Sequence, residues 1–442
     1  MRLFVLLLIL LLFPWSAWAE NGLIRDAEIE TYLHSLSRPI FEAAGVDPES
    51  VQIFIIDSNT INAFVAGGSN MFFNTGLLME TNNPEMLLGV MAHETGHIAG
   101  AHLARGARPM QNAQIGAIIS YVVGAAAAAA GAGDVGMAIM SGGSEVANRG
   151  ILSYTRSNER AADQMGLEFL DADEVTAEGM LDMFEKLRRN EKRYLGRPDP
   201  YTQSHPLSFE RIAVIRRHLA NSQYKNNRLP EDIQVEHKRM LAKLDGFLNS
   251  PERVMNEYPT SDQSLYGRYA RAVAYYRSSD LDAALKEINS LLKEYPDDPY
   301  FYELKGQVLY ENGKIQEART AYAKAKDLAP NAAIIRADYA RTLLGLNDPS
   351  LVKEAVTELE RATGKDGSYG TAWRALSDAY GRAGNQPMAT LALAEEASLR
   401  NDLDATIRFA TQAKKALKEG SPGYLRAADL IEISKRTKKE QS

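Results

Sequence analysis

The second half of the chain repeats itself with a period of 34 residues. Three positions recur after one period: Ala284 and Ala318, Ile288 and Tyr322, and Pro296 and Pro330. A period of this length is typical of paired helices that cannot bury their apolar faces alone and therefore stack into a curved array. We predict such an α-solenoid over residues 251–435, with a concave face that receives a protein or peptide. An array that only supports the rest of the chain is the alternative.

Residues 20–245 show a mixed pattern and are predicted to form a separate domain. Strands are expected at 51–57, 61–65 and 71–74, and helices at about 145–170 and 177–193. Asn83 and Pro84 predict the start of one further helix, which the apolar periodicity carries to about residue 104. The expected fold is mostly α with a small antiparallel sheet.

The N-terminus has the features of a secretory signal. Met1 and Arg2 precede an apolar run that ends at Phe13, and small residues lie before the expected cleavage site after Ala19. We expect residues 1–19 to be removed, although an uncleaved membrane anchor is the alternative. The chain has no cysteine, which excludes disulfides and thiolate metal ligands. The periplasm of a bacterium is the expected location.

Residues 115–132 are uncharged and rich in alanine and glycine, at the threshold for a membrane span. A buried helix or hairpin that covers the active site is one interpretation, and an element with peripheral membrane contact is the other. The net charge of −7 gives no general attraction to nucleic acid, so no nucleic-acid partner is expected.

The strongest chemical motif is His93-Glu94-Thr95-Gly96-His97, inside the predicted helix that starts at Pro84. Residues four apart lie on one helix face, so His93 and His97 can bind one metal ion while Glu94 lies beside them. Two imidazoles and one carboxylate with an open position suit zinc. One zinc ion per chain is therefore expected.

A third ligand is sought further along the chain. A histidine six residues after His97 is excluded, because position 103 is leucine. Glu159 on a later predicted helix is the other candidate, and Asp163 follows it by one turn, where it can orient a ligand imidazole. The alternative for this acidic pair is a solvated helix face.

The segment 75–78, the motif at 93–97, and Glu159-x-x-x-Asp163 with Gly166 resemble the gluzincin family that contains the CAAX prenyl protease and the heat-shock protease HtpX. The resemblance implies a zincin-type metalloprotease domain followed by a tetratricopeptide-repeat α-solenoid. It also implies site roles: His93, His97 and Glu159 as zinc ligands, Glu94 as the catalytic general base, and Asp163 as a further catalytic residue.

The same resemblance points to the segment Ser204-His205-Pro206 and to Arg211. In periplasmic members the matching histidine can occupy the open metal position, which makes His205 a candidate regulatory gate. Arg211 is a candidate contact for the substrate or the transition state. A structural loop histidine before a proline is the alternative for His205.

The layout, with a signal peptide and a C-terminal repeat array, is similar to periplasmic members of this family that act in outer-membrane protein assembly. That similarity implies an endopeptidase that degrades misfolded or misassembled outer-membrane proteins and assists their assembly. Its expected partners are unfolded or stalled β-barrel proteins and, through the repeats, their assembly machinery. A chaperone or assembly adaptor with a mostly latent, histidine-plugged metal site is the alternative.

Overall fold

The computed structural model describes residues 22–105, 156–191, 205 and 207–441. The predicted signal peptide and the segment 115–132 lie outside these residues. Within the described ranges, no helix combines the length and the apolar content that a membrane span requires.

The N-terminal domain contains these elements: β1 (Leu23–Ile24), α1 (Ala27–Ala43), η1 (Pro48–Ser50), β2 (Gln52–Ile56), β3 (Ala63–Ala66), β4 (Asn70–Asn74), α2 (Thr75–Glu80), α3 (Pro84–Arg105), α7 (Arg156–Ala172), α8 (Glu178–Glu191), α10 (Phe209–Asn221) and α11 (Glu231–Leu248).

The sheet has four strands in the order β1-β2-β4-β3. The three predicted strands are present within one or two residues of their expected bounds, but the sheet is mixed and not purely antiparallel. β2 runs parallel to β4, while β3 pairs with β4 and β1 pairs with β2 in antiparallel fashion. The reason is that β3 and β4 form a hairpin at the far edge, so β4 returns alongside β2 in the same direction. β3 is therefore an edge strand of this sheet.

Helix α3 lies in the centre of the domain and packs against α1, α7 and α8. It begins where the sequence predicts, because the Oδ1 atom of Asn83 accepts a hydrogen bond from the Met86 amide at 2.9 Å. Its side chains are buried on every side from Leu87 to Ala99. A helix buried all round carries no single apolar face, and its polar residues must find partners inside the protein.

The second domain is a stack of helix pairs that follows the short helix α12 (Pro251–Glu257). The pairs are α13 (Leu265–Arg277) with α14 (Leu281–Glu294), α15 (Pro299–Glu311) with α16 (Ile315–Leu328), α17 (Ala333–Gly345) with α18 (Val352–Lys365, preceded by η2, Pro349–Leu351), α19 (Gly370–Arg382) with α20 (Gln386–Leu399), and α21 (Leu403–Ala416) with α22 (Pro422–Gln441). The repeated positions Ala284, Ile288, Ala318 and Tyr322 are buried, as the period predicts.

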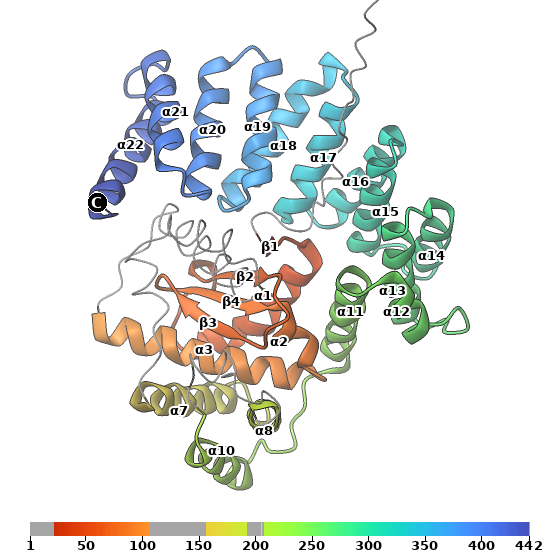
Figure 1. The fold of residues 1–442 in the computed structure, drawn as a ribbon, viewed down its shortest axis with the longest axis vertical. Helices are drawn as coiled ribbons and strands as arrows, with labels where there is room; N and C mark the ends of the chain where they lie inside the picture. Colours follow the sequence, from red (N-terminus) through yellow and green to blue (C-terminus); the bar gives the residue numbers. More distant parts are fainter. Residues whose placement is uncertain (1–21, 106–155, 192–204, 206, 442) are drawn as a thin grey trace, which may run out of the picture.

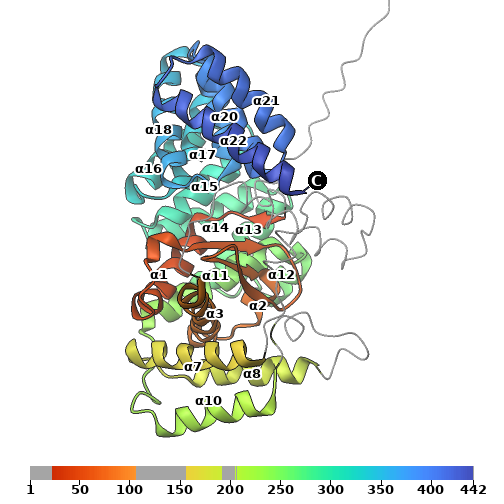
Figure 2. The ribbon, with the colours of Figure 1, turned by 90° about the vertical axis from the view of Figure 1, so that its left-hand side faces the viewer.

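The repeat array arches over the sheet on the side away from α3, α7, α8 and α10, as Figures 1 and 2 show in two directions. Helix α11 joins the two parts, since it packs against α1 and α2 on one side and α13 on the other. Buried polar groups also connect them: Arg239 of α11 pairs with Asp298 of the array at 2.5 Å, and Tyr269 of α13 donates a hydrogen bond to Glu28 of α1. The two domains are thus fastened together by both helix packing and ion pairs.

Candidate metal centre

Three polar side chains of α3 point into a closed space in the N-terminal domain. His93 and Glu94 are fully buried, and His97 is 6% exposed. The Nε2 atoms of His93 and His97 lie 3.1 Å apart, as expected for imidazoles one helical turn apart on the same face. The Glu94 carboxylate is buried, and its Oε1 lies 3.5 Å from His205 Nε2 in a long ion-pair contact. Neither oxygen accepts a hydrogen bond within the described part of the chain, so a bound ion or water would complete the partners of this carboxylate.

Helix α7 brings Glu159 and Asp163 to the same space. Glu159 lies with its two oxygens 3.2 Å from His97 Nε2 and 3.5 Å from His93 Nε2. Asp163, one turn later, lies with Oδ1 2.9 Å from His93 Nδ1. The Nδ1–H of His93 donates to this carboxylate, which leaves Nε2 as the nitrogen directed at the common centre.

The close approach of α3 and α7 depends on two glycines. A Cβ atom at Gly96 would lie 2.6 Å from the carbonyl oxygen of Ala162, and one at Gly166 would lie 3.1 Å from the carbonyl oxygen of Ala92. No side chain fits between the backbones at 2.6 Å, so glycine at position 96 lets the two ligand-bearing helices touch.

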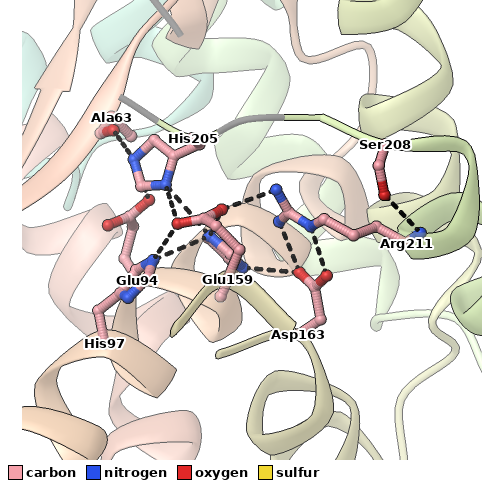
Figure 3. Close-up of polar contacts among 9 residues, drawn as sticks. Ala63, Glu94, His97, Glu159, Asp163, His205, Ser208 and Arg211 are labelled. Carbon is pink, nitrogen blue, oxygen red and sulfur yellow. Dashed lines mark hydrogen bonds and ion pairs between the residues drawn. The ribbon is translucent and has the colours of Figure 1, made fainter. Parts of the chain in front are cut away.

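His205, which lies between α8 and α10 in the sequence, reaches both the ligand side chains and strand β3 (Figure 3). Its Nδ1 lies 3.2 Å from Glu159 Oε1 and 3.4 Å from His93 Nε2. Its Nε2 lies 3.1 Å from the carbonyl oxygen of Ala63 in β3. Because a carbonyl only accepts, Nε2 carries the hydrogen, and in the neutral ring the lone pair on Nδ1 faces the other ligand atoms.

Arg211, in the first turn of α10, lies beside Glu159 and Asp163, on the side away from His205 (Figure 3). Its guanidinium binds both oxygens of Asp163, at 2.6 and 2.7 Å, and also binds Glu159 Oε2 at 2.7 Å. The side chain is 3% exposed. A planar guanidinium suits this bridging of two carboxylates, and it fixes both of them relative to His93. In this structure Arg211 is therefore engaged by the site's own carboxylates.

Phe184 of α8 is a residue that the sequence analysis did not select. Its ring packs edge-on to the His93 imidazole at 5.8 Å and lies 5.0 Å from the Arg211 guanidinium. It is fully buried and therefore restricts the position of both polar side chains. The local signal is only an apolar residue on the buried face of α8, which does not distinguish it from ordinary core residues.

Charge pairing in the site shifts several pKa values. Burial lowers the pKa of His93, but its hydrogen bonds with Asp163 and Glu159 outweigh burial and raise the pKa to about 9. Burial lowers the pKa of His97. Burial opposes ionisation of Glu159 and Asp163, yet hydrogen bonds with the histidines and Arg211 hold both carboxyl pKa values below the ordinary range. Both acids are therefore present as carboxylates.

The residues present fit a zinc ion. One donor atom each from His93, His97, Glu159 and His205 lies within 4.8 Å of the others, and all four residues are buried. Atoms that bind one tetrahedral zinc at about 2.0–2.1 Å lie about 3.3 Å from one another. Four separations agree with that value: His93 Nε2 lies 3.1 Å from His97 Nε2 and 3.4 Å from His205 Nδ1, and Glu159 Oε1 lies 3.2 Å from each of the latter two atoms. Two imidazoles, one carboxylate and one further donor are a suitable set for this metal.

Comparison with known proteins agrees with this geometry. Residues 26–219 match the peptidase family M48, and residues 269–333 match a tetratricopeptide repeat. This chain is a metalloprotease, and its N-terminal domain is similar to peptidase family M48. The fold class expected from the sequence, a metalloprotease domain followed by tetratricopeptide repeats, is thereby confirmed.

Similar proteins include the β-barrel assembly-enhancing protease of Escherichia coli strain K12, which is 28% identical over 90% of this chain and 81% of the relative. A putative β-barrel assembly-enhancing protease of Vibrio cholerae is 27% identical over 91% of this chain and 83% of its own length. The mitochondrial metalloendopeptidase OMA1 of Schizosaccharomyces pombe is 25% identical over 44% of this chain and 54% of its own length. The relatives named for β-barrel assembly therefore match across both domains.

Proposed function

We propose that this metalloprotease is a zinc-dependent endopeptidase whose active site is held latent by His205. The observation that carries the proposal is the position of the His205 imidazole. One nitrogen lies among the donors of His93 and Glu159, and the other is hydrogen-bonded to the edge strand β3. A side chain in this place takes the fourth position of the metal, which a water molecule needs for hydrolysis.

In the open enzyme, His93, His97 and Glu159 would hold the metal. Bound zinc would supply Lewis-acid chemistry, activating a water molecule and polarising the peptide carbonyl. Glu94 lies beside that position, and its one ion-pair contact among the described residues is with His205 at 3.5 Å, so after withdrawal of His205 it would be placed to take a proton from the nucleophile and return it to the leaving amine. Asp163 and Arg211 hold the ligands in place, and neither is needed to touch the substrate.

The edge strand β3 is the proposed binding site for an extended substrate. Its outer side has no strand neighbour in the described sheet, so a peptide can add to it by main-chain hydrogen bonding. The carbonyl of Ala63 on this strand is already bound by His205 at 3.1 Å. Withdrawal of His205 would thus free both a metal position and a substrate hydrogen bond, which makes it suitable as a gate.

The relatives support a proposal for the biological role. Two of them are named for β-barrel assembly and match this chain across both domains. We propose that this chain degrades misfolded or stalled outer-membrane β-barrel proteins in the periplasm and assists their assembly. The repeat array would dock it to the assembly machinery. Peripheral membrane contact through residues 115–132 stays a prediction, since they lie outside the described residues.

The plugged geometry also favours the second candidate, a chaperone or assembly adaptor whose metal site stays closed. Cleavage of an unfolded outer-membrane protein by mature wild type, Glu94→Gln and His205→Ala would separate the two functions. Zinc content of each protein, measured by elemental analysis, accompanies the assay. The protease proposal expects one zinc per chain, no cleavage by Glu94→Gln, and faster cleavage by His205→Ala than by wild type.

Other outcomes are equally informative. Zinc bound to a His205→Ala protein that never cleaves would support the adaptor. Zinc absent from all three proteins would contradict the assignment of His93, His97 and Glu159. Equal cleavage by wild type and His205→Ala would show that the imidazole is not a gate.

A further inference from the structure

A cleft of about 490 Å³ lies between the two domains, on the other side of the sheet from the metal centre. One wall is formed by α1 and the first half of β2, and the other by the start of α17 and the loop after α18. Figure 1 shows β1 and β2 on the side of the sheet that faces the array. The volume is within the range of sites that bind small ligands or short peptide segments, about 300–1,000 Å³.

Among the described strands, only β1 pairs with this edge of β2, and it covers only the second half of β2. β1 pairs with β2 through Leu23 with Ile56 and Ile24 with Ile55, and the Asp57 amide donates to the Gly22 carbonyl at 2.9 Å. In a strand, the backbone N–H and C=O groups of every second residue point to the same edge. Those of Ile53 therefore point to the edge on which β1 lies, as those of Ile55 and Asp57 do.

The chain of β1 cannot continue the pairing as far as Ile53. Asp26 already caps α1 by accepting a hydrogen bond from the Ile29 amide at 2.9 Å, and its own amide donates to Glu30. Only Arg25 and Asp26 separate β1 from α1. Among the described residues, the pairing of β1 with β2 ends at Ile24 and Ile55, and no strand residue pairs with Ile53 on this edge.

A neighbouring side chain is also unpartnered. The Oε1 atom of Gln52 is buried and has no hydrogen-bond partner in the described part of the chain. Gln52 and Ile53 both line the cleft. Buried polar groups are normally paired, so unpaired groups on two successive residues of one strand indicate a missing polar partner.

The charges around the cleft are already neutralised by one another. Arg25 pairs with Glu30 at 2.8 Å and also with Asp366. Glu49 pairs with Arg38 at 2.6 Å and with Lys365 of the array at 3.5 Å. No charge in this set is left over to select an ionic ligand. Small side chains, Ala27, Ala332 and Ala333, line the walls and leave room for a backbone.

We propose that the cleft binds an extended, uncharged polypeptide segment, which adds to the edge of β2 beyond the end of β1. The segment would pair with the backbone of Ile53 and with Gln52, as in other β-strand additions. The site is separate from β3, because β2 and β3 lie on opposite sides of β4. It would hold a client chain away from the metal centre, and its existence does not depend on zinc binding or on cleavage.

The test uses a fluorescent capped hexapeptide of alternating valine and threonine as the probe. Binding to the full-length Glu94→Gln protein, in which His205 still covers β3, is followed by fluorescence anisotropy. Thr31 lines the cleft from α1 and is exposed, so Thr31→Trp would fill the cleft. We expect this variant to weaken binding at least about tenfold.

The matched control is Thr320→Trp in α16. Both threonines are exposed on helices, and each hydroxyl donates to the carbonyl four residues earlier, at 2.6 Å for Thr31 and 3.2 Å for Thr320. The control should bind the probe as the parent does. A probe with N-methylated amides on one edge should bind more weakly than the parent probe, because it cannot donate to β2.

A second readout uses the absence of native cysteine. Ser35→Cys places a single thiol in the cleft wall, and the probe should slow its reaction with a maleimide, whereas Thr320→Cys should react equally with and without the probe. Equal binding by the Thr31→Trp and Thr320→Trp proteins, with no protection of Cys at position 35, would overturn the proposal. That result would not contradict the proposed metal ligands or the proposed protease function, which are tested separately by zinc content and cleavage.

Discussion

The Nε2 atom of His205 lies 3.1 Å from the carbonyl oxygen of Ala63, while Nδ1 of the same ring lies 3.4 Å from Nε2 of His93. One imidazole therefore contacts both the proposed substrate strand and the proposed metal ligands. Under the proposed gating, a side chain with both contacts would exclude substrate and nucleophile together, so the metal position and the substrate strand would open at the same time.

This double contact predicts that His205 affects substrate binding as well as turnover. In the inactive Glu94→Gln background, His205→Ala should bind an extended outer-membrane protein peptide about fivefold more tightly, since one hydrogen bond contributes ~1 kcal/mol. Isothermal titration with zinc-loaded protein measures this directly. The control is His218→Ala, because His218 lies in α10 and pairs with Asp171 outside the site.

If the His205→Ala and His218→Ala proteins bind the peptide equally, β3 is not the substrate strand. Such a result is compatible with a gate that acts only at the metal. It would therefore contradict β3 as the substrate-binding strand, but it would not contradict His93, His97 and Glu159 as metal ligands.

Gly96 should be essential for the contact between α3 and α7. Its replacement by alanine places a methyl group 2.6 Å from the Ala162 carbonyl, so the helices must separate. We expect a loss of ~1–3 kcal/mol in the free energy of unfolding, the usual cost of overpacking. Zinc affinity should fall as well, because Glu159 would move away from His93. Urea unfolding and zinc competition with a chelator check both effects.

The control for Gly96→Ala is Gly364→Ala in α18. A Cβ atom at Gly364 meets no atom within 4 Å, so only helix propensity changes there. Alanine should leave zinc affinity unchanged and stabilise the helix by up to about 1 kcal/mol. Comparable losses in the two variants would show that close helix approach is not the reason for glycine at position 96.

Sequence periodicity predicted those features of the fold that depend on residues close together in the chain. His93 and His97 share a helix face because they are four residues apart, and the buried repeat positions Ala284 and Ala318 follow from the period of 34. The helix that starts at Pro84 was predicted from its N-cap. These features depend on neighbours along the chain, which a single sequence contains.

Other features depend on segments that are distant in the sequence. The contact of His205 with Ala63 joins residues separated by 142 positions. The parallel pairing of β2 with β4 depends on a crossover that strand propensity cannot indicate, so the predicted antiparallel sheet was only partly right. Spacing also could not predict the role of Phe184 or the binding of Arg211 to the carboxylates of Glu159 and Asp163, since these groups meet only after α7, α8 and α10 have packed together.

Arg211 should act by positioning the ligands. Arg211→Lys cannot bridge Asp163 and Glu159 with a planar fork, so zinc affinity should fall about 10- to 100-fold, as for other residues that orient metal ligands. In the His205→Ala background and at saturating zinc, the KM for a cleaved peptide should stay unchanged. Chelator competition and steady-state kinetics give the two quantities.

The role of Arg211 is decided by comparing the effect of the substitution on zinc affinity with its effect on the KM for the peptide. Unchanged zinc affinity with a raised KM would show that the guanidinium contacts substrate, as the sequence interpretation first suggested. Arg216→Lys provides the control, because Arg216 lies on the exposed face of α10 and pairs with Glu185. It should alter neither quantity.

Glu28 should make the junction of the two domains sensitive to acid. Its carboxylate lies 2.7 Å from Arg239 and 3.2 Å from Lys243, and it accepts a hydrogen bond from Tyr269 of the array. Burial opposes ionisation, but the two cations and Tyr269 hold the pKa of Glu28 below its ordinary value of 4.5. The folded protein therefore stabilises the charged form.

A carboxyl with a lowered folded pKa contributes stability that is fully present above the unfolded pKa and is lost as the pH falls through the folded pKa. Glu28→Gln should accordingly reduce the free energy of unfolding by about 3 kcal/mol near neutral pH, at the low end for breaking a buried ion pair. Arg239 and Lys243 keep their other partners, Asp298 and Asp26, which limits the loss.

The difference between wild type and Glu28→Gln should shrink as the pH falls below the ordinary glutamate pKa of 4.5. Urea unfolding at a series of pH values measures it. The exposed Glu252, replaced by glutamine, should differ from wild type by no more than about 0.5 kcal/mol at every pH. A Glu28→Gln difference that grows on acidification would mean that Glu28 is already protonated in the folded protein. In that case helix packing, and not the ion pairs of Glu28, would hold the array against the protease domain.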